Sequence, residues 1–581
     1  MGTKQITENI RQRIIDKLVR IYGDEIGANT ASQLISLLAG FNGGENAPYE
    51  LSEKDVVLIT YADQVQKENE SPLSTLHRFL MDTIYPTINS IHILPFYPYS
   101  SDDGFSVIDY LAVKPEFGTW KDVRQLGKNF RLMFDAVFNH ISAQSAWFQG
   151  FLRGEAPYTD YFIHFETMPP KELLDKVVRP RALPLLTEFD TANGKRFVWT
   201  TFSDDQIDLN YANPEVLLEM IKILLFYIEQ GATLIRLDAI AFLWKELGTS
   251  CIHLEQTHLI IQLMRDVLDA VAPHVLLITE TNVPHKENIS YFGDGNNEAQ
   301  MVYQFPLPPL VLHTLHTGNA THLNNWAAEL ERISDTTTFF NFTASHDGIG
   351  LRPVSGILSD EEIEELVTLT QERGGRVSYR SVEGGKPSPY ELNISYFDAI
   401  THPNITQENP NLAVQRFIVS QAIALAVVGV PGIYFHSLFG SRNYYEGVEQ
   451  TGHNRSINRE KLKLDTLTDA LNTSNSIRAK VYSAYKRLLE VRIKEAAFHP
   501  FGQQRVLNAG SGVFAIERIA PNGARALALH HVRGEREVIT LADTHGTWRD
   551  LLTGHIYEAS QTGLEVILEP YQILWLKPAS N

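Results

Sequence analysis

Three acidic side chains in this sequence come at the end of short apolar runs. A carboxylate in such a place must be paired with a cation or take part in chemistry. They are Asp238 in "IRLDAIAF", Glu280 in "LLITETN" and Asp347 in "ASHDG". Burying an unpaired charge is costly. Arg236 lies two residues before Asp238, and residues two apart in a strand point to the same side. We therefore expect Arg236 to orient Asp238 and to hold it ionised.

Carboxylates gathered in one pocket are typical of retaining glycoside chemistry. One carboxylate attacks the anomeric carbon, and the other protonates the leaving oxygen and later deprotonates the incoming acceptor. Asp238 suits the nucleophile because Arg236 favours its charged form. Glu280 suits the acid/base, whose pKa is raised by apolar neighbours and nearby carboxylates. A third acid such as Asp347 can stabilise an oxocarbenium-like transition state without forming a bond.

Eight short apolar segments alternate with helical patterns and must position these acids. Eight alternating βα units predict a (β/α)₈ barrel, whose active site lies at the carboxyl ends of the strands. The three acids end the fourth, fifth and seventh predicted strands, and His140 and His346 lie at the same face. The predicted strands cover residues 55–63, 90–98, 130–140, 232–242, 274–282, 301–309, 338–347 and 429–437.

The spacing of these segments reveals insertions. Each βα unit of a barrel takes about 31 residues. The intervals after the third and seventh strands are far longer, so we expect each to hold an inserted subdomain. The start of the chain shows helical spacing, and its end alternates apolar and polar residues as antiparallel strands do. We predict a helical extension (1–54), a barrel (55–140, 211–349 and 411–497), an inserted domain (141–210), a second inserted subdomain (350–410) and a C-terminal β domain (498–581).

Composition limits the compartment and the partners. The chain has 581 residues, one cysteine (Cys251) and a net charge of −19. A single cysteine excludes an intramolecular disulfide framework and fits the reducing cytoplasm. No apolar run approaches the roughly 20 residues that span a membrane, and the first residues lack the apolar segment of a secretory signal. The negative charge argues against nucleic acid or a membrane as a partner, so an anionic substrate needs a local cluster of basic residues.

Four segments together carry a specific family resemblance. "DAVFNH", "IRLDAIAF", "LLITETN" and "NFTASHD" resemble, in order and spacing, the four characteristic segments of the α-amylase superfamily, glycoside hydrolase family 13. The resemblance implies that Asp238 is the nucleophile, Glu280 the acid/base and Asp347 the transition-state stabiliser. The matching sugar-contacting positions are Arg236, His140 and His346.

Further segments resemble one branch of that superfamily. "LITYAD", "DDGFSVIDY", "RPRALP", "HDGIG" and "NRSINR" are similar to sucrose phosphorylase and its relatives. This implies that Asp102 and Arg455 bind the far hydroxyls of a glucosyl unit, that Phe105 stacks on it, and that Gln206 lies near the acceptor. It also implies phosphorolysis of a glucoside to α-glucose 1-phosphate with retention. Inorganic phosphate is then the co-substrate, and no metal or organic cofactor is needed.

Within the branch, the pattern looks closest to the glucosylglycerate phosphorylases, notably in "WKELGTSCIHLEQTHLI" and "TETNVPHKENISYFG". Glycerate and phosphate are both small anions, and arginine is well suited to bind either. We therefore expect an acceptor site built from "RPRALP" and from the later loop "GGRVSYRSVEGGKPSPYELN". The candidates are Arg179, Arg181, Arg376, Arg380, Lys386, Tyr390 and Glu391.

Several alternatives stay open on sequence grounds. Phosphorylases of sucrose, sucrose 6-phosphate or glucosylglycerol, and a retaining α-glucosidase or transglucosidase, share the same acids. Phosphorylase and hydrolase differ only in which nucleophile resolves the glucosyl-enzyme. A non-catalytic superfamily member, such as a transporter heavy chain, is disfavoured because all three acids are present and no membrane anchor is. We expect a glucoside and phosphate as the only small-molecule partners, and a monomer or a homodimer.

Overall fold

The computed structural model describes residues 6–41, 43, 47–180, 183–380 and 387–579. At its centre is a closed barrel of parallel strands in the order β1-β17-β13-β12-β11-β10-β4-β3. Each barrel strand lies inside one of the eight predicted segments, so the predicted (β/α)₈ barrel is confirmed. The strands are β1 Val57–Thr60, β3 Ser90–Ile93, β4 Arg131–Ala136, β10 Ala232–Leu237, β11 Leu276–Thr279, β12 Met301–Tyr303, β13 Thr338–Asn341 and β17 Val430–Tyr434.

The strands are shorter than the apolar runs that predicted them. The segment 301–309 contributes only β12, because the helix α10 (Leu307–Thr317) begins before the run ends. Pro308 and Pro309 fall in the first turn of α10, where the missing N–H of proline has no helical partner to lose. The barrel strands are buried almost throughout because helices cover the outside and side chains fill the inside.

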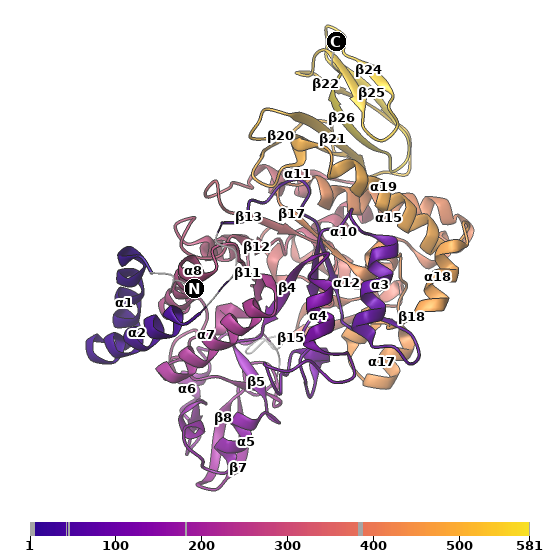
Figure 1. The fold of residues 1–581 in the computed structure, drawn as a ribbon. Coiled ribbons are helices and arrows are strands. Elements are labelled where there is room, and N and C mark those ends of the chain that lie inside the picture. Colours follow the sequence, from indigo (N-terminus) through magenta and orange to yellow (C-terminus); the bar gives the residue numbers. More distant parts are fainter. Residues whose placement is uncertain (1–5, 42, 44–46, 181–182, 381–386, 580–581) are drawn as a thin grey trace.

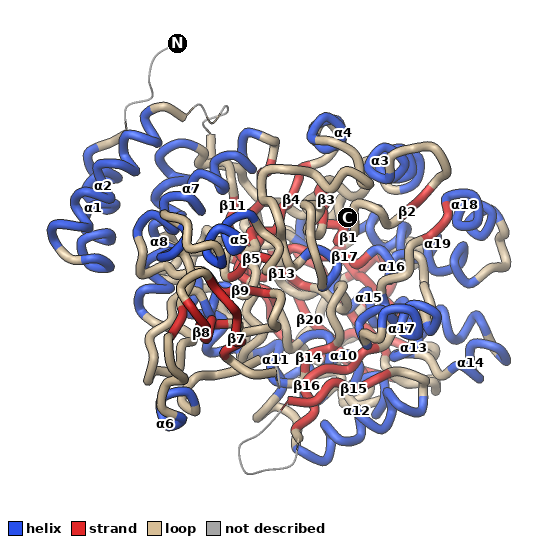
Figure 2. The backbone as a smooth tube through the Cα atoms, turned by 90° about the horizontal axis from the view of Figure 1, so that it is seen from below, coloured by secondary structure: helices blue, strands red, loops and turns tan. Residues whose placement is uncertain are grey.

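A ring of helices surrounds the barrel (Figures 1 and 2). Two of them begin with the dipeptide Asn-Pro, which caps a helix and presets its first turn. The side chain of Asn213 accepts a hydrogen bond from the backbone of Glu215, and that of Asn409 accepts one from Leu412. The ring includes α3 Pro72–Thr83, α4 Trp120–Leu126, α7 Pro214–Glu229, α8 Glu255–Val271, α10, α15 Pro410–Ala426 and α19 Ile477–Arg492.

A helical hairpin precedes the barrel and packs outside it against α8 (Figure 1). It consists of α1 Glu8–Tyr22 and α2 Asp24–Ala39. A β-carbon on Gly27 would approach the carbonyl oxygen of Leu18 to 2.5 Å, so the two helices cross this closely only with glycine there. Asp266 of α8 binds Lys17 Nζ at 2.6 Å and Arg13 Nε at 3.0 Å, which ties the hairpin to the barrel.

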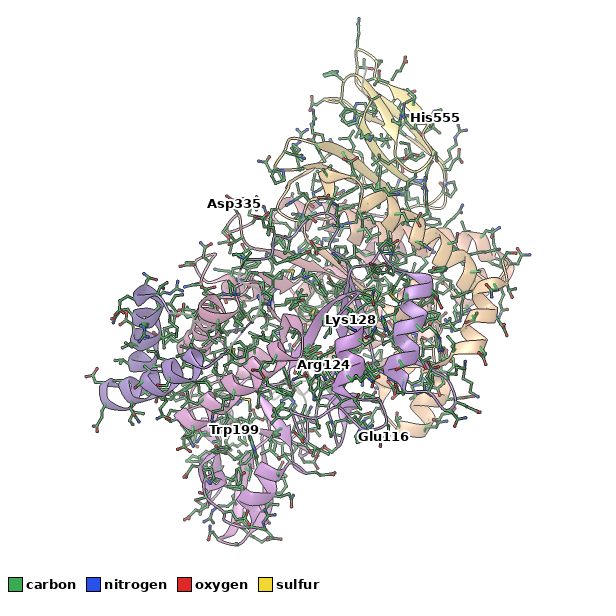
Figure 3. The ribbon with its side chains drawn as sticks, viewed as in Figure 1. Glu116, Arg124, Lys128, Trp199, Asp335 and His555 are labelled. Carbon is green, nitrogen blue, oxygen red and sulfur yellow. The ribbon has the colours of Figure 1, made fainter. Side chains whose placement is uncertain are left out.

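Two inserted segments flank one end of the barrel (Figure 2). The first begins after β4 with β5 and ends with β9, and these two strands pair antiparallel. It has a small core of its own around the buried Trp199, labelled in Figure 3. The second follows β13. The first comprises β5 His140–Ser142, α5 Ala146–Leu152, β6 His164–Phe165, α6 Lys171–Leu174, β7 Leu186–Thr191, β8 Gly194–Trp199 and β9 Gln206–Asp208. The second comprises β14 Ile349–Gly350, α12 Asp360–Glu372, β15 Arg376–Arg380, β16 Ser388–Asn393, α13 Tyr396–Ile400 and α14 Pro403–Glu408.

The end of the chain forms antiparallel sheets at the opposite side of the molecule from the first inserted segment (Figure 1). This confirms the predicted C-terminal antiparallel domain. Within the described ranges, no helix combines the length and apolar character needed to cross a membrane. The strands are β19 Gln503–Val506, β20 Val513–Ile519, β21 Arg525–His531, β22 Glu537–Leu541, β23 Thr547–Asp550, β24 Ile556–Glu558, β25 Leu564–Leu568 and β26 Ile573–Pro578.

Candidate active site

A pocket at the carboxyl ends of the barrel strands brings together the three predicted acids. Asp238 directly follows β10, and Glu280 directly follows β11. Asp347 does not end its strand as predicted, because β13 stops at Asn341 and Asp347 lies in the loop that leads to β14. Most of the predicted glucosyl contacts line the same pocket; they are Asp102, Phe105, His140, Gln206, His346 and Arg455.

Arg236 lies buried beside this pocket, and its guanidinium is within ion-pair distance of three carboxylates. Its Nη1 binds Asp135 and is 2.8 Å from Asp238 Oδ1, and its Nη2 is 3.9 Å from Glu280 Oε2. Asp135, at the end of β4, also contacts His92 Nε2 at 2.6 Å. Since β4, β10 and β11 are neighbours in the barrel, their ends meet around one guanidinium. Asp135 belongs to the segment "DAVFNH", and no role was predicted for it from the sequence.

The pKa values of Asp238 and Glu280 are both shifted by burial and by neighbouring charges. Burial raises the pKa of Asp238 and of Glu280 although Arg236 lowers both, and neighbouring carboxylates raise them further. We predicted from the sequence that Arg236 keeps Asp238 ionised; in the structure the same guanidinium also binds Asp135. Arg236 Nη1 contacts Asp238, whereas Nη2 is farther from Glu280, so the guanidinium favours the charged form of Asp238 more strongly.

The backbone after Asp238 fixes the second carboxylate. Ala239 adopts a left-handed conformation with φ 48°, which costs a residue with a β-carbon roughly 1–2 kcal/mol. In that conformation its N–H donates to Glu280 Oε2 at 3.0 Å. The turn thus links the residue next to Asp238 with the carboxylate of Glu280, and such strained backbone is common at functional sites.

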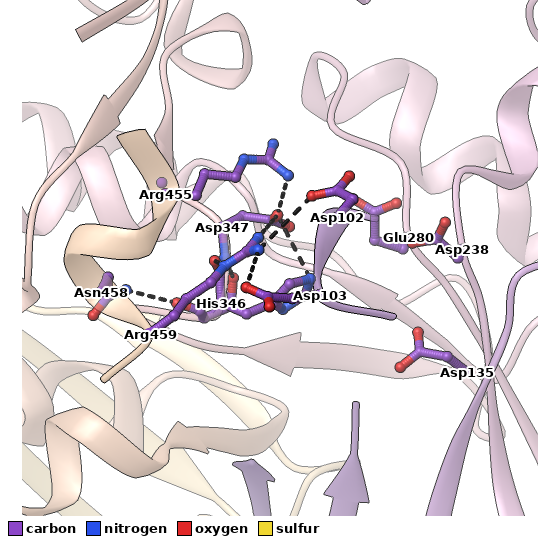
Figure 4. A network of polar contacts seen from close by, with 12 residues as sticks. Asp102, Asp103, Asp135, Asp238, Glu280, His346, Asp347, Arg455, Asn458 and Arg459 are labelled. Atoms are coloured by element: carbon purple, nitrogen blue, oxygen red, sulfur yellow. Dashed lines mark hydrogen bonds and ion pairs between the residues drawn. The ribbon is translucent and has the colours of Figure 1, made fainter. Parts of the chain in front are cut away.

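Two arginines surround Asp347 on its side of the pocket. Arg455 Nη1 is 2.7 Å from Asp347 Oδ1. The same guanidinium donates two hydrogen bonds to Glu391, from Nε to Oε2 at 3.1 Å and from Nη2 to Oε1 at 2.9 Å. Burial by itself raises the pKa of Asp347, but Arg455, His346 and Arg459 together bring it well below its usual range. Asp347 is therefore ionised. Figure 4 shows Arg455 and Arg459 directed at Asp347, with Glu280, Asp238 and Asp135 to one side.

Arg459 was not singled out from the sequence although it ends the quoted "NRSINR". Its Nη1 is 2.9 Å from Asp103 Oδ2 and 3.7 Å from Asp102 Oδ1, and its Nε donates to the carbonyl of His346 at 2.7 Å. Asp102 and Asp103 both have positive φ, of 51° and 48°. Arg459 therefore joins two strained aspartates to the loop that carries His346 and Asp347.

Aromatic and imidazole rings form another wall of the pocket. Phe105 stacks on His346 with ring centroids 4.8 Å apart and planes 5° from parallel. The Phe105 carbonyl accepts hydrogen bonds from His140 Nε2 at 2.9 Å and from Gln206 Nε2 at 3.2 Å. Burial lowers the pKa of His140 to about 4 and that of His346 to about 3, so both rings are neutral near pH 7.

A buried ion pair supports His140 from behind. Lys245 Nζ lies 2.8 Å from Asp208 Oδ2 and donates to Asn139 Oδ1 at 2.6 Å. Because the amide oxygen of Asn139 faces Lys245, its NH₂ group faces His140 Nδ1 at 3.2 Å. His140 Nδ1 then accepts, and the ring proton sits on Nε2, as its bond to Phe105 requires. Lys245 was also not identified from the sequence.

Lys245→Met is expected to lower the free energy of unfolding by about 3–5 kcal/mol, because Asp208 would remain buried without its cation. The unfolding midpoint in urea measures this. Lys222→Met is the matched control, since Lys222 binds Glu219 at 2.6 Å on the surface, where such pairs contribute about 1 kcal/mol or less. Equal losses in the two variants would contradict the supporting role of Lys245.

The acceptor candidates divide into groups. Arg179, Arg380 and Tyr390 line a second pocket that adjoins the first and also reaches Glu280, together with Arg352, which the sequence did not suggest. Glu391 lines the first pocket but is engaged by Arg455 on the Asp347 side. Arg376 is exposed at the start of β15 and lines neither pocket. The remaining candidates, Arg181 and Lys386, lie outside the described residues.

Comparison with known proteins agrees with this geometry. Residues 87–361 match the family described as Alpha amylase, catalytic domain. A glucosylglycerate phosphorylase from Allomeiothermus silvanus is 48% identical over 98% of this chain and 99% of its own length. One from Escherichia coli K12 is 45% identical over 98% of this chain and 100% of its own length.

A solved structure gives the same fold. The crystal structure of sucrose 6F-phosphate phosphorylase from Thermoanaerobacter thermosaccharolyticum matches with a TM-score of 0.72 and 24% identity, over 89% of this chain and 98% of that one. The resemblance found in the sequence segments is confirmed by the two glucosylglycerate phosphorylases. The chain belongs to the α-amylase family, glycoside hydrolase family 13, in the branch of the glucosylglycerate and sucrose phosphorylases.

Proposed function

We propose that this protein is a retaining phosphorylase that cleaves 2-O-α-glucosylglycerate with inorganic phosphate, giving α-glucose 1-phosphate and glycerate. The observation that carries the proposal is identity of 45–48% to curated glucosylglycerate phosphorylases along nearly the whole chain. The arginine-lined pocket beside Glu280 supports it, because both glycerate and phosphate are anions. A cytoplasmic location is part of the proposal, since the single cysteine suits a reducing compartment.

In the first half-reaction, a carboxylate oxygen of Asp238 attacks the anomeric carbon as Glu280 gives its proton to the departing glycerate oxygen. A β-glucosyl ester of Asp238 forms and glycerate leaves. Ionised Asp347 stabilises the positive charge that develops on the sugar ring. We assign the glucosyl unit to the part of the pocket bounded by Asp102, Phe105, His140, Gln206, His346 and Arg455.

In the second half-reaction, Glu280 is a carboxylate and takes a proton from phosphate. A phosphate oxygen attacks the anomeric carbon from the face that glycerate left, and the bond to Asp238 breaks. Two inversions give net retention, hence α-glucose 1-phosphate. Both steps are made by carboxylates and the co-substrate phosphate, so the proposal includes no metal or organic cofactor.

A panel of glucosides tests the choice of acceptor. With phosphate present, kcat/KM for glucosylglycerate should exceed that for sucrose and for neutral glucosylglycerol by at least about tenfold, which is about 1.4 kcal/mol. Sucrose 6-phosphate belongs in the panel because it is an anion of another shape. A tenfold preference for a neutral glucoside, or for sucrose 6-phosphate, would exclude glycerate as the natural acceptor.

A further inference from the structure

The second pocket shares Glu280 with the first and gathers three arginines on its wall. Arg179 comes from the first inserted segment, Arg352 from the short turn Arg352–Val354 after β14, and Arg380 from the end of β15. The other lining residues include Ala239, Asn282 and Tyr390. Segments far apart in the sequence therefore bring positive charge to a pocket that Glu280 lines and Asp347 does not.

The positive charge of this wall is only partly balanced. Arg352 Nη2 is 3.7 Å from Glu287 Oε2, and Glu287 also contacts His253 Nε2 at 3.1 Å. Burial lowers the pKa of Arg352, and Arg380 lowers it further by repulsion, while Glu287 opposes both. Among the described residues, no carboxylate is within ion-pair distance of Arg179 or Arg380. Clustered guanidinium groups in a partly buried wall favour the binding of an anion.

We propose that Arg352 is the specificity-determining residue of an anion subsite completed by Arg179 and Arg380. The subsite binds the carboxylate of glycerate in the first half-reaction and phosphate in the second. This inference rests on the proposed function, because it assigns Glu280 as the residue that protonates the leaving oxygen.

The chemistry of the two acceptors explains why one subsite can serve both. In 2-O-glucosylglycerate the carboxylate is bonded to the same carbon as the glycosidic oxygen that Glu280 protonates. In phosphate the charged oxygens are bonded to the same phosphorus as the attacking oxygen. Either anion therefore places its negative charge next to the oxygen that Glu280 protonates or deprotonates, within reach of the pocket that the arginines line.

Arg352 is the best placed of the three to set this preference. It begins a one-turn helix whose next residues, Pro353 and Val354, are buried, so its backbone is well supported. Glu287 contacts one end of its guanidinium, and an arginine has five N–H donors, so others remain for an anion. Lysine keeps the positive charge of arginine but lacks this planar, forked arrangement of donors.

The test forms the glucosyl-enzyme from α-glucosyl fluoride and then varies the acceptor among phosphate, glycerate and neutral glycerol. Arg352→Ala should raise the KM for phosphate and for glycerate together, each by at least about thirtyfold. The KM for glycerol should change by less than about threefold. Arg352→Lys should recover part of the loss for both anions. Formation of free glucose from the fluoride in water shows that each variant is folded.

Arg196→Ala is the matched control. Arg196 is also half-buried with one carboxylate partner, Glu166 at 3.0 Å, but it lies in β8 and lines neither pocket. Its KM values should remain those of the wild type. If Arg352→Ala leaves both anion KM values within about threefold, or raises only one, the shared subsite is wrong. Failure of the proposed function shows instead in the wild type, as a preference for glycerol over glycerate.

Discussion

Asp238→Asn is expected to lower phosphorolysis of glucosylglycerate by more than a hundredfold while leaving the fold intact. The amide is nearly isosteric with the carboxylate and can remain beside Arg236, but it cannot form the ester that carries the glucosyl unit. The measurements are kcat with saturating phosphate and a circular dichroism spectrum. Residual activity above about one hundredth of the wild type would reject Asp238 as the nucleophile.

Asp135→Asn is the control for this prediction, because Asp135 also contacts Arg236 but does not line the pocket. Intact-mass spectrometry after mixing with α-glucosyl fluoride should detect a glucosyl adduct on this variant. The Asp238→Asn protein should carry none. An adduct on Asp238→Asn would place the covalent bond on another residue.

Glu280→Gln is expected to separate acid catalysis from the rest of the mechanism. Glucosylglycerate has a poor leaving group, so its phosphorolysis should fall by about 10²–10⁴. Formation of the glucosyl-enzyme from α-glucosyl fluoride should fall far less, since fluoride departs with little protonation. Comparison of the two rates in the same variant is the measurement. Equal losses for both substrates would mean that Glu280 is not the general acid.

The same residue should govern the alkaline limb of the pH profile. Burial and neighbouring carboxylates raise the pKa of Glu280, so its protonated form persists to higher pH than that of an ordinary glutamate. As pH rises through that pKa the acid is lost, and kcat/KM for glucosylglycerate should fall. For α-glucosyl fluoride this alkaline fall should be weak in the wild type and absent in Glu280→Gln. An unchanged fall in the variant would assign it to another group.

The barrel was predictable because each of its strands is a short, continuous apolar run, which the buried environment of a parallel sheet requires. Asp238 and Glu280 were predictable for the related reason that a charged residue interrupts such a run. The ends of the strands could not be predicted as closely. Asp347 was predicted to end the seventh strand, but β13 stops at Asn341. The residues between them are apolar or buried because they line the pocket, and the sequence does not distinguish this burial from that of a barrel strand.

Contacts between distant segments could not be read from spacing. Nothing in the sequence shows that Asp135 shares Arg236 with Asp238, or that Lys245 reaches Asn139 and Asp208. Arg352 was overlooked because a single arginine after "HDGIG" looks like a solvated loop charge. Its significance appears only when the fold brings Arg179 and Arg380 to the same pocket as Glu280.

Nuclear magnetic resonance of the first products tests the central claim most directly. Protein, phosphate and glucosylglycerate are mixed, and proton and phosphorus spectra are recorded from the earliest times. The proposed double displacement predicts α-glucose 1-phosphate and glycerate in equal amounts, with little free glucose. β-Glucose 1-phosphate would contradict retention through Asp238, and free glucose as the main product would show a hydrolase in place of a phosphorylase.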